Sequence, residues 1–573
     1  MWFSRLWIPS CFYLLTCLAC TPAPQDSATL ILTGDRLWTG NPEQPWAEAV
    51  AVREDRLLAV GSREELSRYQ GASTRLIELA GGFILPGFID SHTHFNRAAE
   101  LLLGVNLLEV ADEESLIKAV REACERLPAG SWLIGGDWGA YEAWGQGSTG
   151  QGSIGESSPV DPFLPHRSMI DPVSLEHPAL LSKWDRSSYL ANSRALEAAS
   201  VSCEWRGVNC DRDGEPTGRL SAEAADRVRA VIPPKSMHQR LAEARVAMAR
   251  LRELGVTGIH DITPPEQLRA FLELQQRQEL SVRIYARPTL DKWEHLAALG
   301  IEHGFGNEWL RIGGLKGFVD GIMGNSSARF YEPYLTSGQR GSWRTMMEPA
   351  GNMERLLTGA DAAGHVPQVH AIGDEAIDHL LDLFARLEEV NGAADRRLRM
   401  IHAQVLRGPE VADRMAAMGV IAEVQPYHTI DDMRWMEERI GERSRWAYAF
   451  RTLSDAGVTL SFGSDWPGTN ASWYPASPVL GIYAAVTRQT LEGQPSEGWY
   501  PEERLDVETA LRAYTTNNAW AAGEGSLKGS LEPGKLADLV VLSDDPFTLE
   551  PSRLKDVRVL LTMVGGDIVH QRD

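Results

Sequence analysis

The feature that most constrains the fold is a series of short apolar runs, each ending in a polar or charged residue and followed by a helix-like stretch. Eight such runs occur, at Gly82–His92, Pro178–Asp185, Val256–Asp261, Leu310–Asp320, His365–His370, Leu398–His402, Gly419–Gln425 and Val458–Asp465. The stretches between them carry apolar residues at three- and four-residue spacing. Strand–helix alternation repeated eight times is typical of parallel strands that close into a barrel. The expected fold class is therefore α/β, with a TIM-type (β/α)8 barrel.

The two ends of the chain differ from its middle. Short segments of alternating character occur near both termini, for example Ala49–Arg53 and Ala537–Leu542. Each end alone offers too few strands to bury one face of a sheet. We therefore expect residues 27–82 and 525–573 to pair into one small composite β-sandwich, with residues 83–524 forming the barrel.

Two intervals within the barrel are too long for simple crossovers, at about residues 95–175 and 190–235. The first contains Trp132, Trp138 and Trp144, and then a Gly/Ser-rich run over residues 145–158. Long loops of this kind are either lids and substrate walls or flexible surface. Both possibilities are open for this chain.

Residues with metal-binding chemistry stand where several of these runs end. His92 and His94 follow a Pro-Gly turn. Because residues i and i+2 share one face of a strand, both imidazoles point the same way, which suits a divalent metal. A lysine such as Lys316 is costly within an apolar strand. Three further candidates are His370, His402 and Asp465, each at the end of its run. Each residue alone has an ordinary structural explanation, but such residues on five strands at the same end of one barrel indicate a single metal site.

The order His-x-His, Lys, His, His, Asp resembles that of the binuclear amidohydrolases. The chain also resembles the YtcJ-like branch of the amidohydrolase-3 family, through the segments LKGFVDGIMGNSSARFYEPY, HAIGDEAID, IHAQ, VQPYH, GSDWP, AYTTNNAWAAG and GSLEPGKLADLVVL. The resemblance covers nearly the whole mature chain. It implies the barrel and the composite sandwich that the pattern of the chain also predicts.

The resemblance further implies a set of metal ligands. His92, His94 and Asp465 would hold the more buried of two divalent metal ions, and His370 and His402 would hold the second. Lys316 would bridge both ions as a carbamate formed with carbon dioxide. Zinc is the expected metal, although such a site accepts other divalent ions.

The implied function is hydrolysis of a carbon–nitrogen bond other than a peptide bond, in an amide, cyclic amide or N-acyl substrate. Two metal ions would acidify a bridging water to give the attacking hydroxide. Asp465 would accept the proton of this water and pass it to the leaving nitrogen. One alternative is a mononuclear deaminase of the same superfamily, which Lys316 disfavours. The other is a catalytically inactive, membrane-anchored binding protein.

Four further residues are candidates near the site. Ser187 stands where the family usually has a histidine that faces the substrate, so the substrate preference of relatives does not transfer. His260 and Asp320 face either the substrate pocket or structural hydrogen bonds. Asp90 either orients a metal ligand or is a turn residue.

The N-terminus predicts export. Arg5 is followed by an apolar stretch that is too short to span a bilayer, and the stretch ends at Cys17-Leu-Ala-Cys20. This end of the predicted signal segment, residues 1–20, resembles a lipoprotein lipobox, in which the residues before Cys20 would be removed and Cys20 would be acylated; an ordinary cleaved signal is the alternative. The expected location is periplasmic or in the cell envelope, with a lipid anchor in a bacterial membrane.

Charge and cysteine content narrow the partners. The formal net charge of −22 argues against nucleic acid, whose phosphates favour Lys and Arg. The expected partner is a small-molecule substrate, with membrane contact only through Cys20; the oligomeric state is not readable. Cys203 and Cys210 are spaced to permit a disulfide in an oxidising compartment, which leaves Cys124 as a buried apolar side chain.

Overall fold

The computed structural model describes residues 27–572 apart from residues 109, 111, 140–163, 185 and 469–474. The predicted signal segment with Cys20 therefore lies outside the described residues, and so do Trp144 and the run over residues 145–158. Across the described ranges, none of the helices has the length and apolar character needed to cross a membrane.

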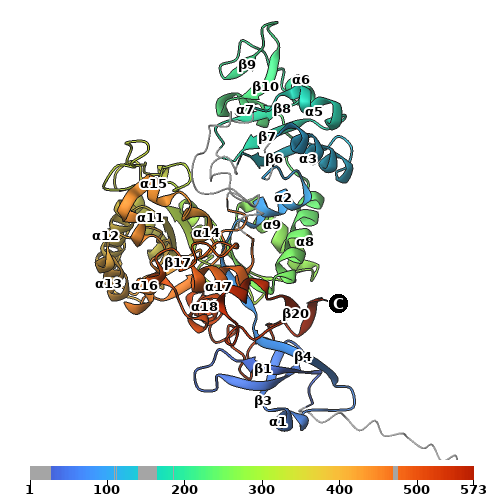
Figure 1. Cartoon of the computed structure of the whole chain (residues 1–573), viewed down its shortest axis with the longest axis vertical. Coiled ribbons are helices and arrows are strands. Elements are labelled where there is room, and N and C mark those ends of the chain that lie inside the picture. Colours follow the sequence, from blue (N-terminus) through green and yellow to red (C-terminus); the bar gives the residue numbers. More distant parts are fainter. Residues whose placement is uncertain are drawn as a thin grey trace, which may run out of the picture.

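Two parallel sheets form the middle of the molecule (Figure 1). The first has the order β13-β12-β11-β5, with β5 (Phe88–Thr93), β11 (Val256–Ile262), β12 (Arg283–Arg287) and β13 (Leu310–Ile312). The second has the order β14-β15-β16-β17-β18, with β14 (Leu315–Phe318), β15 (Pro367–Ala371), β16 (Arg399–His402), β17 (Ile421–Val424) and β18 (Leu460–Phe462). These strands are almost entirely buried, as parallel strands are when helices cover their outer faces.

Isolated bridges connect the two sheets at both ends. Thr289, beyond β12, pairs with Lys316 in β14, and Thr93, at the end of β5, pairs with Trp466 just beyond β18. In space, the strands therefore follow one another in the order β5, β11 and β12, then β13 and β14 together, and then β15, β16, β17 and β18. The mixed α/β fold is confirmed, and full closure of these strands into one barrel stays a prediction.

Helices alternate with these strands along the chain. Those that follow or separate them are α2 (Phe95–Leu103), α8 (Met237–Glu253), α9 (Pro265–Gln276), α10 (Trp293–Ala298), α11 (Asn352–Ala362), α12 (Asp374–Asn391), α13 (Pro409–Ala417), α14 (His428–Asp432), α15 (Met436–Ile440), α16 (Phe450–Asp455), α17 (Pro478–Thr487), α18 (Val507–Tyr514) and α19 (Thr516–Ala521). Their apolar faces and the strands share two large buried clusters. This packing fixes the strand ends from which the candidate site is built.

One of the eight expected barrel strands is wrong. β7 (Ala179–Lys183), within the run 178–185, pairs with β6 (Leu133–Trp138) and β8 (Tyr189–Ala191) in a separate sheet, and β5 pairs directly with β11. A strand that the sequence analysis did not expect, β12, lies one place further on, between β11 and β13. Its terminal residues Arg283 and Arg287 resemble surface residues in sequence, but both are buried and paired with acidic side chains.

Residues of both long inserts fold together with β7 into one α/β unit. Its sheet has the order β6-β7-β8-β10-β9, with β9 (Val208–Cys210) and β10 (Pro216–Leu220), and it packs with α3 (Glu113–Arg126), α5 (Arg167–Ser174), α6 (Ser193–Ala198) and α7 (Ala222–Arg229). The unit has apolar clusters of its own and lies at one end of the molecule's long axis (Figure 1). It contains the Cys203–Cys210 disulfide that the spacing permits, and Cys124 is partly rather than fully buried in it.

The two ends of the chain meet in one seven-stranded sheet. Its order is β21-β20-β19-β4-β1-β2-β3, with β1 (Leu30–Trp38), β2 (Trp46–Arg53), β3 (Arg56–Gly61), β4 (Arg75–Pro86), β19 (Leu539–Leu542), β20 (Val559–Val564) and β21 (Asp567–Gln571). The short helix α1 (Arg63–Ser67) follows β3. β4 joins the halves, because it pairs in parallel with β1 and antiparallel with β19. The division of this sheet into a two-layer sandwich stays a prediction.

A buried ion pair ties the C-terminal segment to the middle of the molecule. Arg283 Nε and Nη2 donate to the carboxylate of Asp538 at 2.6 and 2.9 Å, and both side chains are almost fully buried. We expect Asp538→Asn to lower the free energy of unfolding by about 3–5 kcal/mol, because it leaves the Arg283 charge buried without its partner. Urea unfolding checks this, with the exposed Asp567→Asn as the matched control. Equal stability of the two variants would contradict the expectation.

Candidate metal centre

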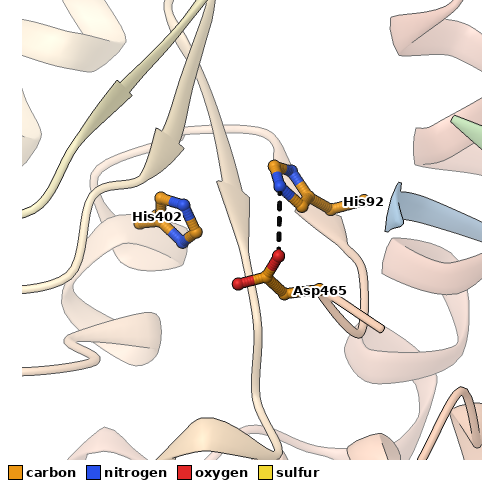
Figure 2. A group of neighbouring side chains, drawn as sticks. All are labelled: His92, His402 and Asp465. Carbon is orange, nitrogen blue, oxygen red and sulfur yellow. Dashed lines mark ion pairs between the residues drawn. The ribbon is translucent and has the colours of Figure 1, made fainter. Parts of the chain in front are cut away.

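Three side chains from distant parts of the chain converge beyond the carboxyl ends of the strands. His92 in β5, His402 at the end of β16 and Asp465 just after β18 offer nitrogen and oxygen atoms that all lie within 4.8 Å of one another. His92 Nε2 is 3.4 Å from Asp465 Oδ1, the pair marked in Figure 2. Two imidazoles and a carboxylate form a donor set that suits a divalent metal such as zinc.

The other three predicted ligands surround this group. His94 follows the end of β5, and its Nε2 lies 3.2 Å from Asp465 Oδ1. The ring of His370, in β15, has its centroid 4.6 Å from that of His402. Lys316 in β14 is buried. Burial is the main cause that lowers the pKa of His92 and of His402, and the charge of Lys316 lowers both further. The structure thus gathers all six residues. Among the described residues, only His92, His402 and Asp465 bring the atoms that could ligate a metal within 4.8 Å of one another.

Two buried atoms at this point are without hydrogen-bond partners among the described residues: Nε2 of His92 and Oδ1 of Asp465. The other ring nitrogen of His92 donates to Glu423 at 2.6 Å, and Nδ1 of His402 donates to Gln425 at 2.7 Å. Each imidazole therefore presents an unprotonated Nε2. Because a buried acceptor without a donor is costly, this arrangement fits a bound divalent cation.

The backbone of two of these residues is strained. His402 has φ +76° and Asp465 has φ +58°, both in the left-handed region that favours glycine. Such conformations cost about 1–3 kcal/mol each, and they persist where the surrounding structure holds them in place. Their coincidence with two converging donor groups supports a functional role for this point of the fold.

Burial and neighbouring charges set the protonation of the site. Burial and then the Lys316 charge lower the pKa of His92 to about 3, so this imidazole is neutral. Burial and the nearby Arg287 lower the pKa of the Lys316 amine to about 7. Burial alone would raise the pKa of Asp465, but His92 and His94 reverse this and hold it well below its usual value. The site therefore offers neutral imidazole, an ionised carboxylate and a partly neutral amine.

A fully buried carboxylate, which the sequence analysis missed, supports His92. Glu423 in β17 accepts the bond from His92, and it also accepts from Arg287 at 2.8 and 3.0 Å and from Arg399 at 2.9 Å. The two guanidinium groups hold the pKa of Glu423 well below its usual value against the effect of burial. A charged residue within the buried strand Ile421–Val424 was the available signal in the sequence.

We expect Glu423→Gln to weaken metal binding by about 10- to 100-fold, the range found for residues that support a metal-ligating histidine. The free energy of unfolding should also fall by about 3–5 kcal/mol, because the charges of Arg287 and Arg399 lose their counter-ion. Competition with a fluorescent chelator measures the first effect and urea unfolding the second. Glu410→Gln, at an exposed glutamate of α13, is the matched control. Unchanged metal affinity would contradict this role.

The remaining candidates have varied surroundings. Asp90 accepts bonds from the backbone N–H of His92 at 3.0 Å and of Ser464 at 2.9 Å, so it holds the two ligand-bearing segments together. Nδ1 of His260 accepts a bond from Arg399 at 2.9 Å, below the site. Asp320 accepts from three backbone N–H groups, at Arg329, Ile372 and Gly373, and lies 3.3 Å from His370 Nε2. Ser187 is exposed in the insert. Substrate contact by His260, Asp320 or Ser187 stays a prediction.

A second residue that the sequence analysis did not single out is His428. It lies at the start of α14, is buried, and has its Nε2 3.9 Å from Asp465 Oδ2. Burial lowers the pKa of this imidazole, which is therefore neutral near pH 7. Its place next to Asp465 gives the site a further group that can accept or donate a proton.

Comparison with known proteins points to one family. The model of the amidohydrolase family matches residues 75–570. The chain is 32% identical to the protein LONG AFTER FAR-RED 3 of Arabidopsis thaliana, over 97% of this chain and 94% of that protein. It is 29% identical to YtcJ of Bacillus subtilis (strain 168), which is named as an amidohydrolase, over 94% and 99%. It is 26% identical to the N-substituted formamide deformylase of Arthrobacter pascens, over 92% and 95%.

One solved crystal structure is similar to this chain over nearly the whole length of both. The crystal structure of a metal-dependent hydrolase from Pyrococcus horikoshii OT3 superposes with a TM-score of 0.73 at 25% identity. The match covers 91% of this chain and 99% of that one. The similarity therefore extends over the middle of the molecule together with most of the remaining elements.

Proposed function

The chain belongs to the amidohydrolase family, and from this premise we propose that it is a binuclear enzyme that cleaves a carbon–nitrogen bond outside peptide bonds. Its matches to the family and to a metal-dependent hydrolase identify it as a metal-dependent hydrolase. The observation that carries the finer proposal is the convergence of His92, His402 and Asp465, with unpartnered acceptors on His92 and Asp465.

We assign the ligands as follows. His92, His94 and Asp465 hold one ion, and the pair of contacts from His92 and His94 to the same Asp465 oxygen supports this grouping. His370 and His402 hold the second ion, supported by the contact between their rings. Zinc fits imidazole and carboxylate donors well, and a neighbouring pair of ions would share the charge of Asp465 and of a bridging group.

Lys316 supplies the bridging group as a carbamate. The neutral amine would attack the carbon of carbon dioxide, so that the N–C bond forms as one C=O π bond breaks, and the nitrogen would lose one proton to water to give an N-carboxylate anion. Burial favours the neutral amine that this reaction needs. The product replaces a buried cation, which would repel metal ions, by a two-oxygen anionic ligand.

When bound, the divalent ions supply an activated water and polarise the carbonyl group of the substrate. Asp465 is ionised and accepts a proton from the water at this point, and it then donates that proton to the departing nitrogen. His428 Nε2 lies 3.9 Å from the second oxygen of Asp465 and is a further buried imidazole beside this carboxylate. Glu423 holds His92 in one tautomer throughout.

The substrate proposed is a small amide, cyclic amide or N-acyl compound. A relative that matches over 95% of its length is named N-substituted formamide deformylase. Compounds with short N-acyl groups are therefore the first to test. The two-sheet middle of the molecule is proposed to be a closed (β/α)8 barrel, supported by the bridges at Thr93 and Thr289. Export, with a lipid anchor at Cys20, is proposed from the N-terminal sequence alone.

A direct test is turnover by the purified, metal-loaded protein against N-formyl and N-acetyl amines, cyclic ureides and aryl amides. We expect hydrolysis of at least one class, loss of nearly all activity after chelation, and its return when zinc is added back. His370→Ala should keep the fold and lose activity. Release of ammonia from the substrate to leave a deaminated product, with one metal ion per chain, would favour a deaminase instead. No turnover and no bound metal at neutral pH would end the proposal.

A further inference from the structure

Two arginines converge on one buried carboxylate where the insert meets the middle of the molecule. Arg97 Nη2 donates to Asp137 Oδ2 at 2.5 Å, and Arg186 Nη1 lies 2.6 Å from Asp137 Oδ1. Ser182 donates to the same Oδ1 at 2.8 Å. The side chain of Asp137 is 1% exposed, whereas those of Arg97 and Arg186 are 28% and 44% exposed. We call Arg97 and Arg186 the arginine pair.

One member of the arginine pair, Arg97, contacts segments that carry two of the predicted metal ligands. Arg97 is in the first turn of α2, where its backbone N–H donates to the carbonyl of His94. Its Nη1 donates to the carbonyl of Gly468 at 2.5 Å, and Gly468 in turn donates to the backbone of Asp465. The Arg97 guanidinium therefore contacts the segment that begins at Asp465, and the helix that carries Arg97 follows His94. Arg186 lies close to Arg97 because both contact the carboxylate of Asp137.

The backbone at two residues of this cluster is strained, and one buried donor in it has no partner. Asp137 and Arg186 both have φ +62°, in the left-handed region that side chains other than glycine rarely adopt. Arg97 Nε is buried and has no hydrogen-bond partner in the part of the chain that the structure describes. One carboxylate faces two guanidinium groups, so the cluster carries a net positive charge in a chain whose formal net charge is −22. A cluster that served stability alone would be expected to balance its charges and its donors.

We propose that the arginine pair binds a carboxylate group of the substrate and so selects acidic N-acyl compounds, of the N-acyl amino acid type, for hydrolysis at the metal centre. This inference rests on the proposed function. Guanidinium groups bind carboxylates by paired, charge-assisted hydrogen bonds. Asp137 is the positioning residue: it holds both guanidinium groups by one bond each and leaves other N–H donors for the ligand. The carboxylate of the substrate adds the negative charge that balances the two guanidinium groups against Asp137.

The experiment compares matched ligands that differ only in charge. N-acetylglycine and N-formylglycine, together with larger N-acyl amino acids, are paired with their C-terminal carboxamides. Binding to the metal-loaded protein is measured by calorimetry and hydrolysis by kcat/KM. We expect the carboxylates to be preferred by about 10- to 100-fold, the range for hydrogen bonds to charged groups. Arg186→Gly suits the positive φ and should abolish this preference by weakening the carboxylates, with little change for the carboxamides.

Two further variants separate recognition from a merely structural role. Arg186→Lys keeps the charge and should retain part of the preference. Arg206→Gly removes an exposed arginine of the same insert and should leave the preference unchanged. A uniform loss for both members of each pair, or a lower melting temperature without loss of preference, would show a tether between insert and barrel and overturn the inference. Turnover with equal preference overturns it while the proposed function stands. Carboxylate binding that depends on Arg186, without any turnover, supports the binding role of the arginine pair but overturns the proposed function and, with it, selection for hydrolysis.

Discussion

Replacing Asp465 by asparagine is expected to lower kcat/KM of the metal-loaded enzyme by at least about 10³-fold, within the range contributed by general acid–base groups. The carboxylate lies 3.4 Å from His92 and 3.2 Å from His94, and its pKa is well below its usual value, so it is ionised at neutral pH. Asparagine keeps the shape but can neither accept the proton of the water nor give it to the leaving nitrogen. Steady-state kinetics on the best substrate from the screen, with the metal content of each sample, measure the effect.

The control for this variant is Asp413→Asn, at an exposed aspartate of α13. It should leave kcat/KM unchanged. The metal content of Asp465→Asn distinguishes the two roles of Asp465, because a loss of activity with full metal content isolates proton transfer. Activity of Asp465→Asn within a few-fold of the wild type would remove Asp465 from the mechanism.

Lys316→Ala is expected to reduce bound metal below two ions per chain and to lower kcat/KM by at least about 10³-fold, because the proposed bridging anion would be lost from the proposed two-metal site. The same variant leaves space beside β14 that a small carboxylate can fill. Formate or propionate should therefore restore part of the metal content and activity. Metal analysis and kinetics with increasing carboxylate concentration check both expectations.

Lys316→Met fills that space with an uncharged side chain and should not be rescued. Wild-type protein prepared with isotopically labelled bicarbonate should show a carbamate carbon signal that Lys316→Met lacks. Full metal content and activity in Lys316→Ala without any added carboxylate would contradict the bridging role. This outcome would leave the histidines and Asp465 as a simpler site.

The strand assignment shows what a local pattern can and cannot provide. The run at β7 has the apolar character of a barrel strand, and only its pairing with β6 and β8 places it in the insert. β12 begins and ends with arginines whose burial depends on Asp538 and Glu423, which are distant in sequence. Hydrophobic pattern predicts that a segment is a buried strand, but it does not specify the neighbouring strand or the partner of a buried charge.

The candidate site followed the sequence more closely. The ligand set was implied by the family resemblance together with residues at or near strand ends, and in the structure the four histidines lie close to Asp465 or to one another. The charge of buried Lys316 acts on His92. Glu423 and His428 were missed because their roles depend on contacts across the fold, to His92 and to Asp465. The arginine pair is likewise invisible in sequence, since Arg97, Asp137 and Arg186 are far apart along the chain. Metal ligands have a recognisable chemistry, whereas the residues that support them depend on geometry.

The most direct test of the central claim is anomalous X-ray diffraction at the zinc edge, from crystals of the zinc-loaded protein grown with bicarbonate. The account predicts two neighbouring peaks, one contacted by His92, His94 and Asp465 and the other by His370 and His402, with density for a carbamate on Lys316 between them. A single peak, no peak, or peaks away from these residues would contradict it.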